Sequence, residues 1–130
     1  MAHGEFYWNE LMTHDVEASK TFFTAAIGWS FEAMDMGEMG TYWIARQGDK
    51  AVGGVMAMVP DMPPGTPSHW ISYLAVDDID ARLGSMVQAG GQVCRPAFDV
   101  PGVGRIAIVA DPTGAVMGWI TPTPCPDQPA

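Results

Sequence analysis

Apolar and polar residues follow one another in two ways along the chain, first with the period of a strand and then with that of a helix. Residues 69–76 are mostly aromatic or aliphatic types that suit a pleated strand. Asp78 follows, and its carboxylate can accept hydrogen bonds from the free N–H groups that begin a helix. Beyond it, apolar residues recur at helical spacing, at Ile79, Leu83, Met86 and Val87. Gly90 and Gly91 then end the predicted helix.

The same succession occurs earlier in the chain, 63 residues back (78 − 15). Residues 6–12 are strand-like, and Asp15 stands where Asp78 stands in the later copy. The apolar helix positions of the earlier copy are Val16, Phe22, Phe23, Ala26 and Ile27. Gly28 precedes Gly91 by the same 63 residues (91 − 28), so the expected helix ends also agree. The helix cap, the apolar helix positions and the terminal glycine all recur at the same separation in the sequence. This recurrence predicts two copies of one structural module.

Three further strand candidates follow each predicted helix. They are residues 29–34, 41–46 and 51–59 in the first copy, and residues 92–98, 103–110 and 115–121 in the second. Each module is thus predicted as βαβββ, the first over residues 5–59 and the second over residues 69–121. Residues 60–68 hold four prolines and are expected to link the modules. Residues 122–130 hold four more and are expected to form an extended tail.

These elements predict an α+β fold in which residues 1–130 form a single domain. A chain of this length can build one substantial hydrophobic core. Each sheet would have one face covered by its helix and one face left uncovered. We expect the two uncovered faces to turn toward each other and form a partly open barrel or cleft, the kind of space where small ligands bind.

The charge balance narrows the class of partner. Fifteen acidic residues against six basic ones give a net charge of −9, which disfavours the phosphate backbone of nucleic acids and anionic membrane surfaces. The apolar runs are too short to span a bilayer, and no basic and apolar leader opens the chain. Two cysteines are too few for a disulfide scaffold. We therefore expect a cytoplasmic protein whose partner is a small molecule.

Several segments, in their order and spacing, resemble the vicinal oxygen chelate superfamily, which includes glyoxalase I, extradiol dioxygenases, and bleomycin- and fosfomycin-resistance proteins. The segments are Asp15-Val-Glu-Ala-Ser-Lys-Thr-Phe-Phe-Thr-Ala-Ala-Ile-Gly-Trp29 and Asp111-Pro-Thr-Gly-Ala115. Shorter matches, to the glyoxalase-like branch sometimes labelled hydroxylase, are Trp8-Asn-Glu-Leu11, His69-Trp-Ile-Ser-Tyr73, Val76-Asp-Asp78 and Gly104-Arg-Ile-Ala107. The resemblance covers about residues 5–121. It implies paired βαβββ modules and a homodimer.

The resemblance also implies where a metal would be held. In metal-dependent members, four ligands come from the first, fourth, fifth and eighth strands and face the cleft. The corresponding positions here are Trp8, Gly54, Ile71 and Gly118. None of these side chains offers an oxygen or imidazole donor for a divalent cation, so we expect neither a metal nor another cofactor. A non-standard metal site could use Glu10 and His69, although a catalytic ion usually has three protein ligands.

Without a metal, the centre of the predicted cleft is aromatic and apolar. Trp8 and Ile71 would fill it, and the two glycines would leave room beside them. The predicted lining, by strand alternation, consists of Trp8, Glu10, Trp43, Met56, Ile71, Tyr73 and Gly118. Aromatic walls with one carboxylate suit a flat aromatic or cationic organic molecule. The alternative is that these side chains simply pack as core.

Glu10 has a role in each competing hypothesis. As an orienting carboxylate, it belongs to a metal-free protein that binds a small molecule. As a general base, it would belong to a glyoxalase-like lyase or isomerase or to a hydroxylase-type enzyme, which would use either Glu10 or a recruited cofactor. It could instead form a structural ion pair with Arg46 or Arg105. A third hypothesis is a catalytically silent dimeric scaffold, and the sequence does not name the ligand.

Overall fold

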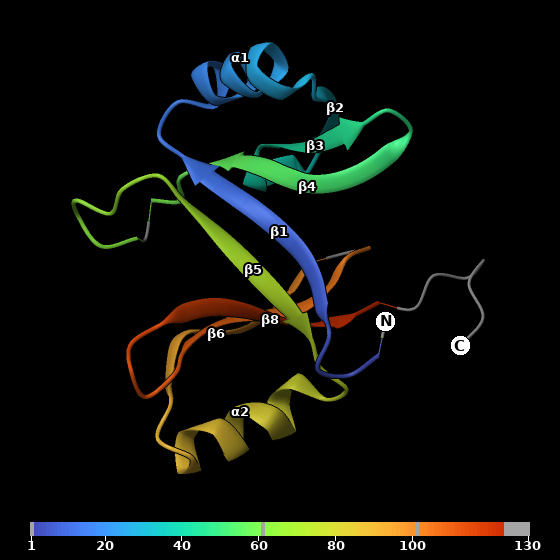
Figure 1. Cartoon of the computed structure of the whole chain (residues 1–130). Coiled ribbons are helices and arrows are strands. Elements are labelled where there is room, and N and C mark those ends of the chain that lie inside the picture. Colours follow the sequence, from blue (N-terminus) through green and yellow to red (C-terminus); the bar gives the residue numbers. More distant parts are fainter. Residues whose placement is uncertain (1, 61, 101, 124–130) are drawn as a thin grey trace. The chain divides into compact units, whose positions relative to one another are not determined.

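The structure, a computed structural model, describes residues 2–60, 62–100 and 102–123. Within them lie two α-helices and eight strands (Figure 1). The predicted tail falls outside the described residues from residue 124 onward, and so does Cys125. The chain divides into two compact units, Trp8–Ile71 and the remainder. The prediction of a single domain with a cleft between the modules depends on how these two units are placed, so it stays a prediction.

The first module has the predicted order of strand, helix and three strands. Its elements are β1 (Phe6–Thr13), α1 (Val16–Ile27), β2 (Ser30–Asp35), β3 (Thr41–Gln47) and β4 (Lys50–Ala57). The strands lie in the order β2-β3-β4-β1, with β1 parallel to β4 and the other neighbours antiparallel. A short 3-10 helix, η1 (Gly37–Met39), connects β2 to β3.

The second module repeats this arrangement strand for strand. Its elements are β5 (His69–Ala75), α2 (Ile79–Gln88), β6 (Gln92–Val100), β7 (Gly104–Ala110) and β8 (Val116–Pro122). The strands lie in the order β5-β8-β7-β6, with β5 parallel to β8. The α+β fold with two βαβββ modules, predicted from the 63-residue repeat, is therefore confirmed. Among the described residues, no helix is long and apolar enough to cross a membrane.

The helix caps show why the repeat was visible in sequence. Asp15 and Asp78 both have extended backbones, and each carboxylate accepts a hydrogen bond from the N–H three residues on, at 3.0 and 3.3 Å. Gly28 ends α1 in the left-handed conformation, with a φ of 80°. The left-handed glycine after α2 is Gly90, with a φ of 98°, and not Gly91 as the offset predicted. Gly91 lies in a tight place, because a Cβ there would lie 2.8 Å from the flexible end of Met86 and 3.1 Å from the carbonyl oxygens of Met86 and Ala110.

The two helices pack differently on their sheets. Beneath α2 lies a buried aliphatic cluster formed by Val76, Ile79, Met86, Ala107 and Val109. Val87, predicted for the same stripe, is instead 53% exposed. No residue of α1 is buried, and two members of its predicted stripe, Phe22 and Ile27, are 61% and 51% exposed. The apolar periodicity located both helices, but only α2 buries part of its stripe in an aliphatic core.

Candidate functional site

The sheet of the first module has two distinguishable faces. On the face that α1 covers, the Lys20 ammonium lies 3.1 Å from the centroid of the Trp43 ring, and Phe23 contacts Trp70 edge to face. Strand alternation then directs Tyr42 to the opposite face, and the same rule turns Ile71 away from the side of Trp70. We call this opposite side the far face; it carries Trp8, Glu10, Met12, Tyr42, Gly54 and Met56. Trp43, predicted as lining, lies on the helix-covered face instead.

The centre of the far face is a tryptophan–tyrosine pair built over a glycine. The Trp8 indole N–H donates a hydrogen bond of 2.8 Å to the Tyr42 hydroxyl. A Cβ added to Gly54 would collide with that same hydroxyl, so the phenol lies directly over the Gly54 backbone. Sequence reasoning expected open room beside Gly54, whereas Tyr42 fills it. Tyr42 was missed because strand alternation was started from Trp43, its neighbour on the other face.

The second module has a corresponding feature. Tyr73 of β5 is paired in register with Gly118 of β8. A Cβ on Gly118 would overlap the Tyr73 ring, which is only 6% exposed. Met117 and Trp119, on either side of Gly118, pack against the cluster beneath α2, so Gly118 and Tyr73 lie on the face away from that helix. The room that was expected at Gly118 is thus occupied by a tyrosine ring.

The residues at the four positions where related folds hold a metal do not fit such a site. Their side chains are an indole, an aliphatic chain and two hydrogen atoms, and none is an oxygen or imidazole donor. At Gly54 and Gly118, the volume that a longer ligating side chain would need is taken by tyrosine rings. Within the described ranges, no group of three His, Cys, Asp or Glu side chains is arranged to hold an ion.

The histidines near the first module are held by the proline-rich linker. The His14 Nε2 lies 2.6 Å from the Thr66 carbonyl oxygen, and the His69 Nδ1 lies 2.8 Å from the Pro67 carbonyl oxygen. A ring nitrogen that donates its proton to a carbonyl leaves the other nitrogen of the same ring with a lone pair. The conjectured pairing of His69 with Glu10 around an ion therefore stays a conjecture, and it offers two of the three ligands that a catalytic ion usually has.

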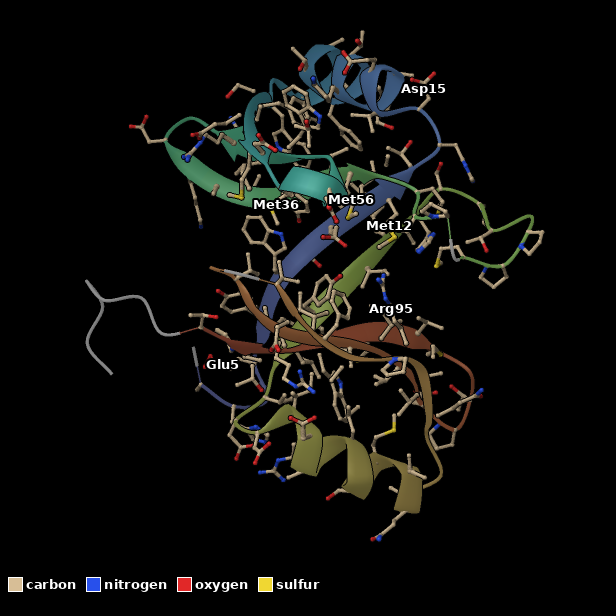
Figure 2. All side chains as sticks on the ribbon, turned by 180° about the vertical axis from the view of Figure 1, so that it is seen from behind. Glu5, Met12, Asp15, Met36, Met56 and Arg95 are labelled. Carbon is tan, nitrogen blue, oxygen red and sulfur yellow. The ribbon has the colours of Figure 1, made fainter. Side chains whose placement is uncertain are left out.

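Glu10 is the buried carboxylate of the far face, with 7% of its surface exposed. It is paired in register with Gly54, and the next pair on the same face is Met12 and Met56, which lie side by side in Figure 2. Glu10 takes part in an interaction and is not without a partner. The two arginines considered as its partners pair elsewhere, Arg46 with Glu32 at 2.7 Å and Arg105 with Asp80 at 3.0 Å.

Among the described residues, pKa values depart from the ordinary ones at surface carboxylates and arginines of the second module. The bidentate hydrogen bonds of Arg82 hold the pKa of Asp77 far below its usual value. The hydroxyl and backbone N–H of Thr113, with the N–H of Ala115, lower the pKa of Asp111. Asp111 thereby shapes the tight turn before β8. These carboxylates stabilise turns and caps rather than a reaction centre.

Known proteins resemble this chain at the level of both sequence and fold. A family model described as bleomycin resistance protein-like N-terminal matches residues 5–41. CFP32 of Mycobacterium bovis, named as a candidate glyoxylase, is 40% identical over 93% of this chain and 45% of its own length. The anthracycline biosynthesis protein DnrV of Streptomyces peucetius is 35% identical over 89% of this chain and 46% of its own length. The chain thus spans about half the length of these relatives.

A solved structure agrees with the fold over most of the chain. Methylmalonyl-CoA epimerase from Mycobacterium tuberculosis matches with a TM-score of 0.64, covering 93% of this chain and 89% of the epimerase chain. Its sequence identity is 15%, which establishes a common fold and nothing about a common substrate.

Proposed function

Because this chain belongs to the vicinal oxygen chelate superfamily of glyoxalase-like and bleomycin-resistance-like proteins, we propose that it binds a small, flat aromatic or cationic organic molecule without a metal. The ligand would lie on the far face of the first module, against Trp8, Tyr42 and Met56. The observation that carries this proposal is the hydrogen-bonded Trp8–Tyr42 pair standing over Gly54, where related folds place metal ligands.

The chemistry of the far face supports a ligand of this class. Trp8, Tyr42 and Met56 are half-buried, so their side chains retain surface that a ligand could cover. Indole and phenol rings stack on flat molecules, and a methionine thioether adapts to irregular shapes. Their π faces and the net charge of −9 favour a cation over an anion. One relative is named for anthracycline biosynthesis, and anthracyclines are flat polycyclic molecules.

A calorimetric titration with doxorubicin, which is planar and carries a protonated amine, tests the proposal. Trp8→Ala should weaken binding at least about tenfold, because the ring loss removes both stacking area and the Tyr42 contact. Tyr42→Phe should cause a smaller loss, since it removes only the hydroxyl. Trp43→Phe, on the helix-covered face, is the matched aromatic control and should bind as the parent does. Equal effects of the Trp8 and Trp43 variants would refute the assignment of the site.

Metal independence has a separate measurement. The same titration is repeated after dialysis against a chelator and again with added Zn²⁺ or Mn²⁺. The proposal requires the same affinity in all three samples, because none of the positions inherited from the metal-binding fold offers a donor. Loss of binding after chelation, followed by recovery with one metal, would contradict it.

A glyoxalase-like isomerase or lyase is the second candidate, favoured by the name of the Mycobacterium relative and by the buried Glu10. In this reading, the Glu10 carboxylate would abstract a proton from the substrate carbon next to a carbonyl. Glu10→Gln keeps the size of the side chain and removes the base. Turnover of a hemithioacetal that this variant abolishes, with its binding retained, would favour the enzyme over the binding protein.

A further inference from the structure

The edge strand of the second module, β6, has two bulges, and Arg95 lies between them. The register of β6 against β7 shifts once between Val93 and Arg95 and again between Arg95 and Phe98. Val93 and Ala97 both pack against the aliphatic cluster beneath α2. Regular alternation over residues 93, 95 and 97 would direct the Arg95 side chain to that same covered side. A bulge can redirect a side chain to the opposite side of a sheet.

The strand pairing shows which side Arg95 occupies. Arg95 is paired with Ile108 of β7. The two neighbours of Ile108 along β7, Ala107 and Val109, belong to the cluster beneath α2. Paired residues point to one side of a sheet and consecutive residues to opposite sides, so Arg95 and Ile108 face away from α2. Figure 2 shows Arg95 on this side of the sheet, which we call the Arg95 face.

The surroundings of the guanidinium on the Arg95 face are apolar. Strand pairing places four further side chains on this face, namely Phe98, Ile106, Ile108 and Tyr73. Tyr73 is 6% exposed, and the other three are half-buried. All four are aromatic or aliphatic, so they offer a ligand contact area without a charge.

The other charged side chains of these strands lie on the covered side. Within the described part of β6, β7 and β8 they are Asp99 and Arg105, which pair with each other at 3.2 Å. Arg105 also pairs with Asp80 of α2 at 3.0 Å, which places this group on the side of the helix. The charge that these three strands bring to the Arg95 face is therefore that of Arg95.

The Arg95 guanidinium is positioned by the folded chain. Its central carbon, Cζ, lies 4.3 Å from the centroid of the Phe98 ring. Arg95 also takes part in a further interaction, so its side chain is oriented by more than one contact. A guanidinium stacks on a ring by its face, whereas its five N–H donors lie along its edges. Two parallel donors of this kind match the two oxygens of a carboxylate.

The βαβββ topology does not require a cation at this place. The residue 63 positions earlier (95 − 32) is Glu32 of β2, which pairs with Arg46 at 2.7 Å. The described pairs of β2 and β3 run in one register without a shift. The first module thus has an acid where the second has Arg95, and its edge strand lacks the two bulges. Both differences point to a role of Arg95 that is particular to the second module.

We propose that the Arg95 face binds an organic carboxylate with a compact aliphatic body. The carboxylate would accept hydrogen bonds from the Arg95 guanidinium, and the body would cover Ile106 and Ile108. A cation among half-buried apolar side chains attracts an anion more strongly than a fully solvated cation does. The net charge of −9 disfavours multiply charged anions, so a monocarboxylate is favoured over a phosphate. All of these residues belong to the second module, so the site does not depend on the ligand proposed for the first.

A nuclear magnetic resonance titration with two matched probes tests the proposal. Cyclohexanecarboxylate and cyclohexanecarboxamide have nearly the same shape, and only the carboxylate is charged at neutral pH. We expect the carboxylate to move the backbone amide signals of Arg95, Ile106 and Ile108. It should bind at least about tenfold more tightly than the amide, because the charge-assisted hydrogen bonds are made only with the carboxylate.

Variants of two arginines assign the preference to a residue. Arg95→Gln should weaken binding of the carboxylate at least about tenfold and leave binding of the amide unchanged. Arg95→Lys keeps the charge but loses the planar pair of donors, so it should retain only part of the preference. Arg82→Gln is the matched control, since it removes the same charge from an arginine of α2 that pairs with Asp77. It should bind both probes as the parent chain does.

Three results would overturn the proposal. The first is a parent chain whose amide signals in β6 and β7 do not move at carboxylate concentrations up to about 20 mM. The second is movement confined to residues outside the second module. The third is a preference for the carboxylate that Arg95→Gln and Arg82→Gln reduce equally, which would reflect net charge alone. The amide spectrum of each variant shows whether its fold is retained, and the doxorubicin titration of the parent chain tests the first-module site by itself.

Discussion

The two modules share one topology but stabilise it with different chemistry. In the second, α2 buries Ile79 and Met86 against aliphatic strand residues, and the helix is anchored by them. In the first, α1 buries none of its residues and instead rests on stacked aromatic rings and on Lys20 over Trp43. The helix of the second module is therefore held by aliphatic burial, while the helix of the first rests on partly exposed aromatic rings.

The largest expected effect comes from removing the anchor of α2. Ile79 is 1% exposed, so Ile79→Ala should lower the free energy of unfolding by about 2–5 kcal/mol through lost burial and the cavity left behind. The contrasting substitution, Phe22→Ala on α1, should cost less than about 0.5 kcal/mol in the monomer, since Phe22 is largely exposed. Urea denaturation of both variants measures the difference. Equal losses would remove the contrast between the two helices.

The next effect compares the two glycines beneath tyrosine rings. Gly118→Ala should destabilise the chain by about 1–3 kcal/mol, because its Cβ would overlap the buried Tyr73 ring. Gly54→Ala should cost less, since the hydroxyl and the adjoining ring carbons in its way belong to the half-buried Tyr42. Combining it with Tyr42→Ala, which removes the whole ring, should cost less than the sum of the two single losses, which thermal denaturation can measure. Additive losses would mean that Tyr42 does not stand over Gly54.

Removing the two helix caps should change the free energy of unfolding by smaller and more similar amounts. Replacing Asp15 or Asp78 by Ala removes one side-chain hydrogen bond to a helix N–H and should cost about 1 kcal/mol in each module. The Asp15 bond is 3.0 Å and the Asp78 bond 3.3 Å, so Asp15→Ala should be the more costly of the two. Asn at either position keeps an oxygen acceptor and serves as the control, and chemical denaturation gives the ranking.

The smallest effect is a pH dependence located in the second module. The pKa of Asp77 is held down by Arg82, and that of Asp111 by Thr113, so both carboxylates are charged in the folded chain below their unfolded pKa of about 3.8. Groups whose pKa is lowered by folding contribute stability above the unfolded value. That contribution is lost as the pH falls from 3.8 toward the lower folded pKa values. Asp111→Asn should flatten the fall of the midpoint temperature in this range, which thermal denaturation at a series of pH values measures.

Several features of the fold and site could be read from local sequence. Asp15 and Gly28 fix the limits of α1 by backbone chemistry that needs no distant partner, and the same holds for Asp78 in α2. The face of the sheet on which the Trp43 side chain lies could not be predicted in this way. Both faces of its strand carry aromatic or aliphatic residues, so alternation alone gives two equivalent assignments. The Lys20 contact decides between them.

The amino-acid sequence alone determined the duplicated module, the helix limits and the loss of metal-ligating side chains at Trp8, Gly54, Ile71 and Gly118, because each depends on residue type and short-range order. Only the tertiary structure decided that Tyr42 and Tyr73 occupy the space above the two glycines, and that Phe22 and Trp70 remain open to solvent. Those outcomes depend on which side chains meet across strands and beneath a helix. Contacts between residues distant in the chain are set by packing, so an individual contact of this kind cannot be predicted from a pattern along the sequence.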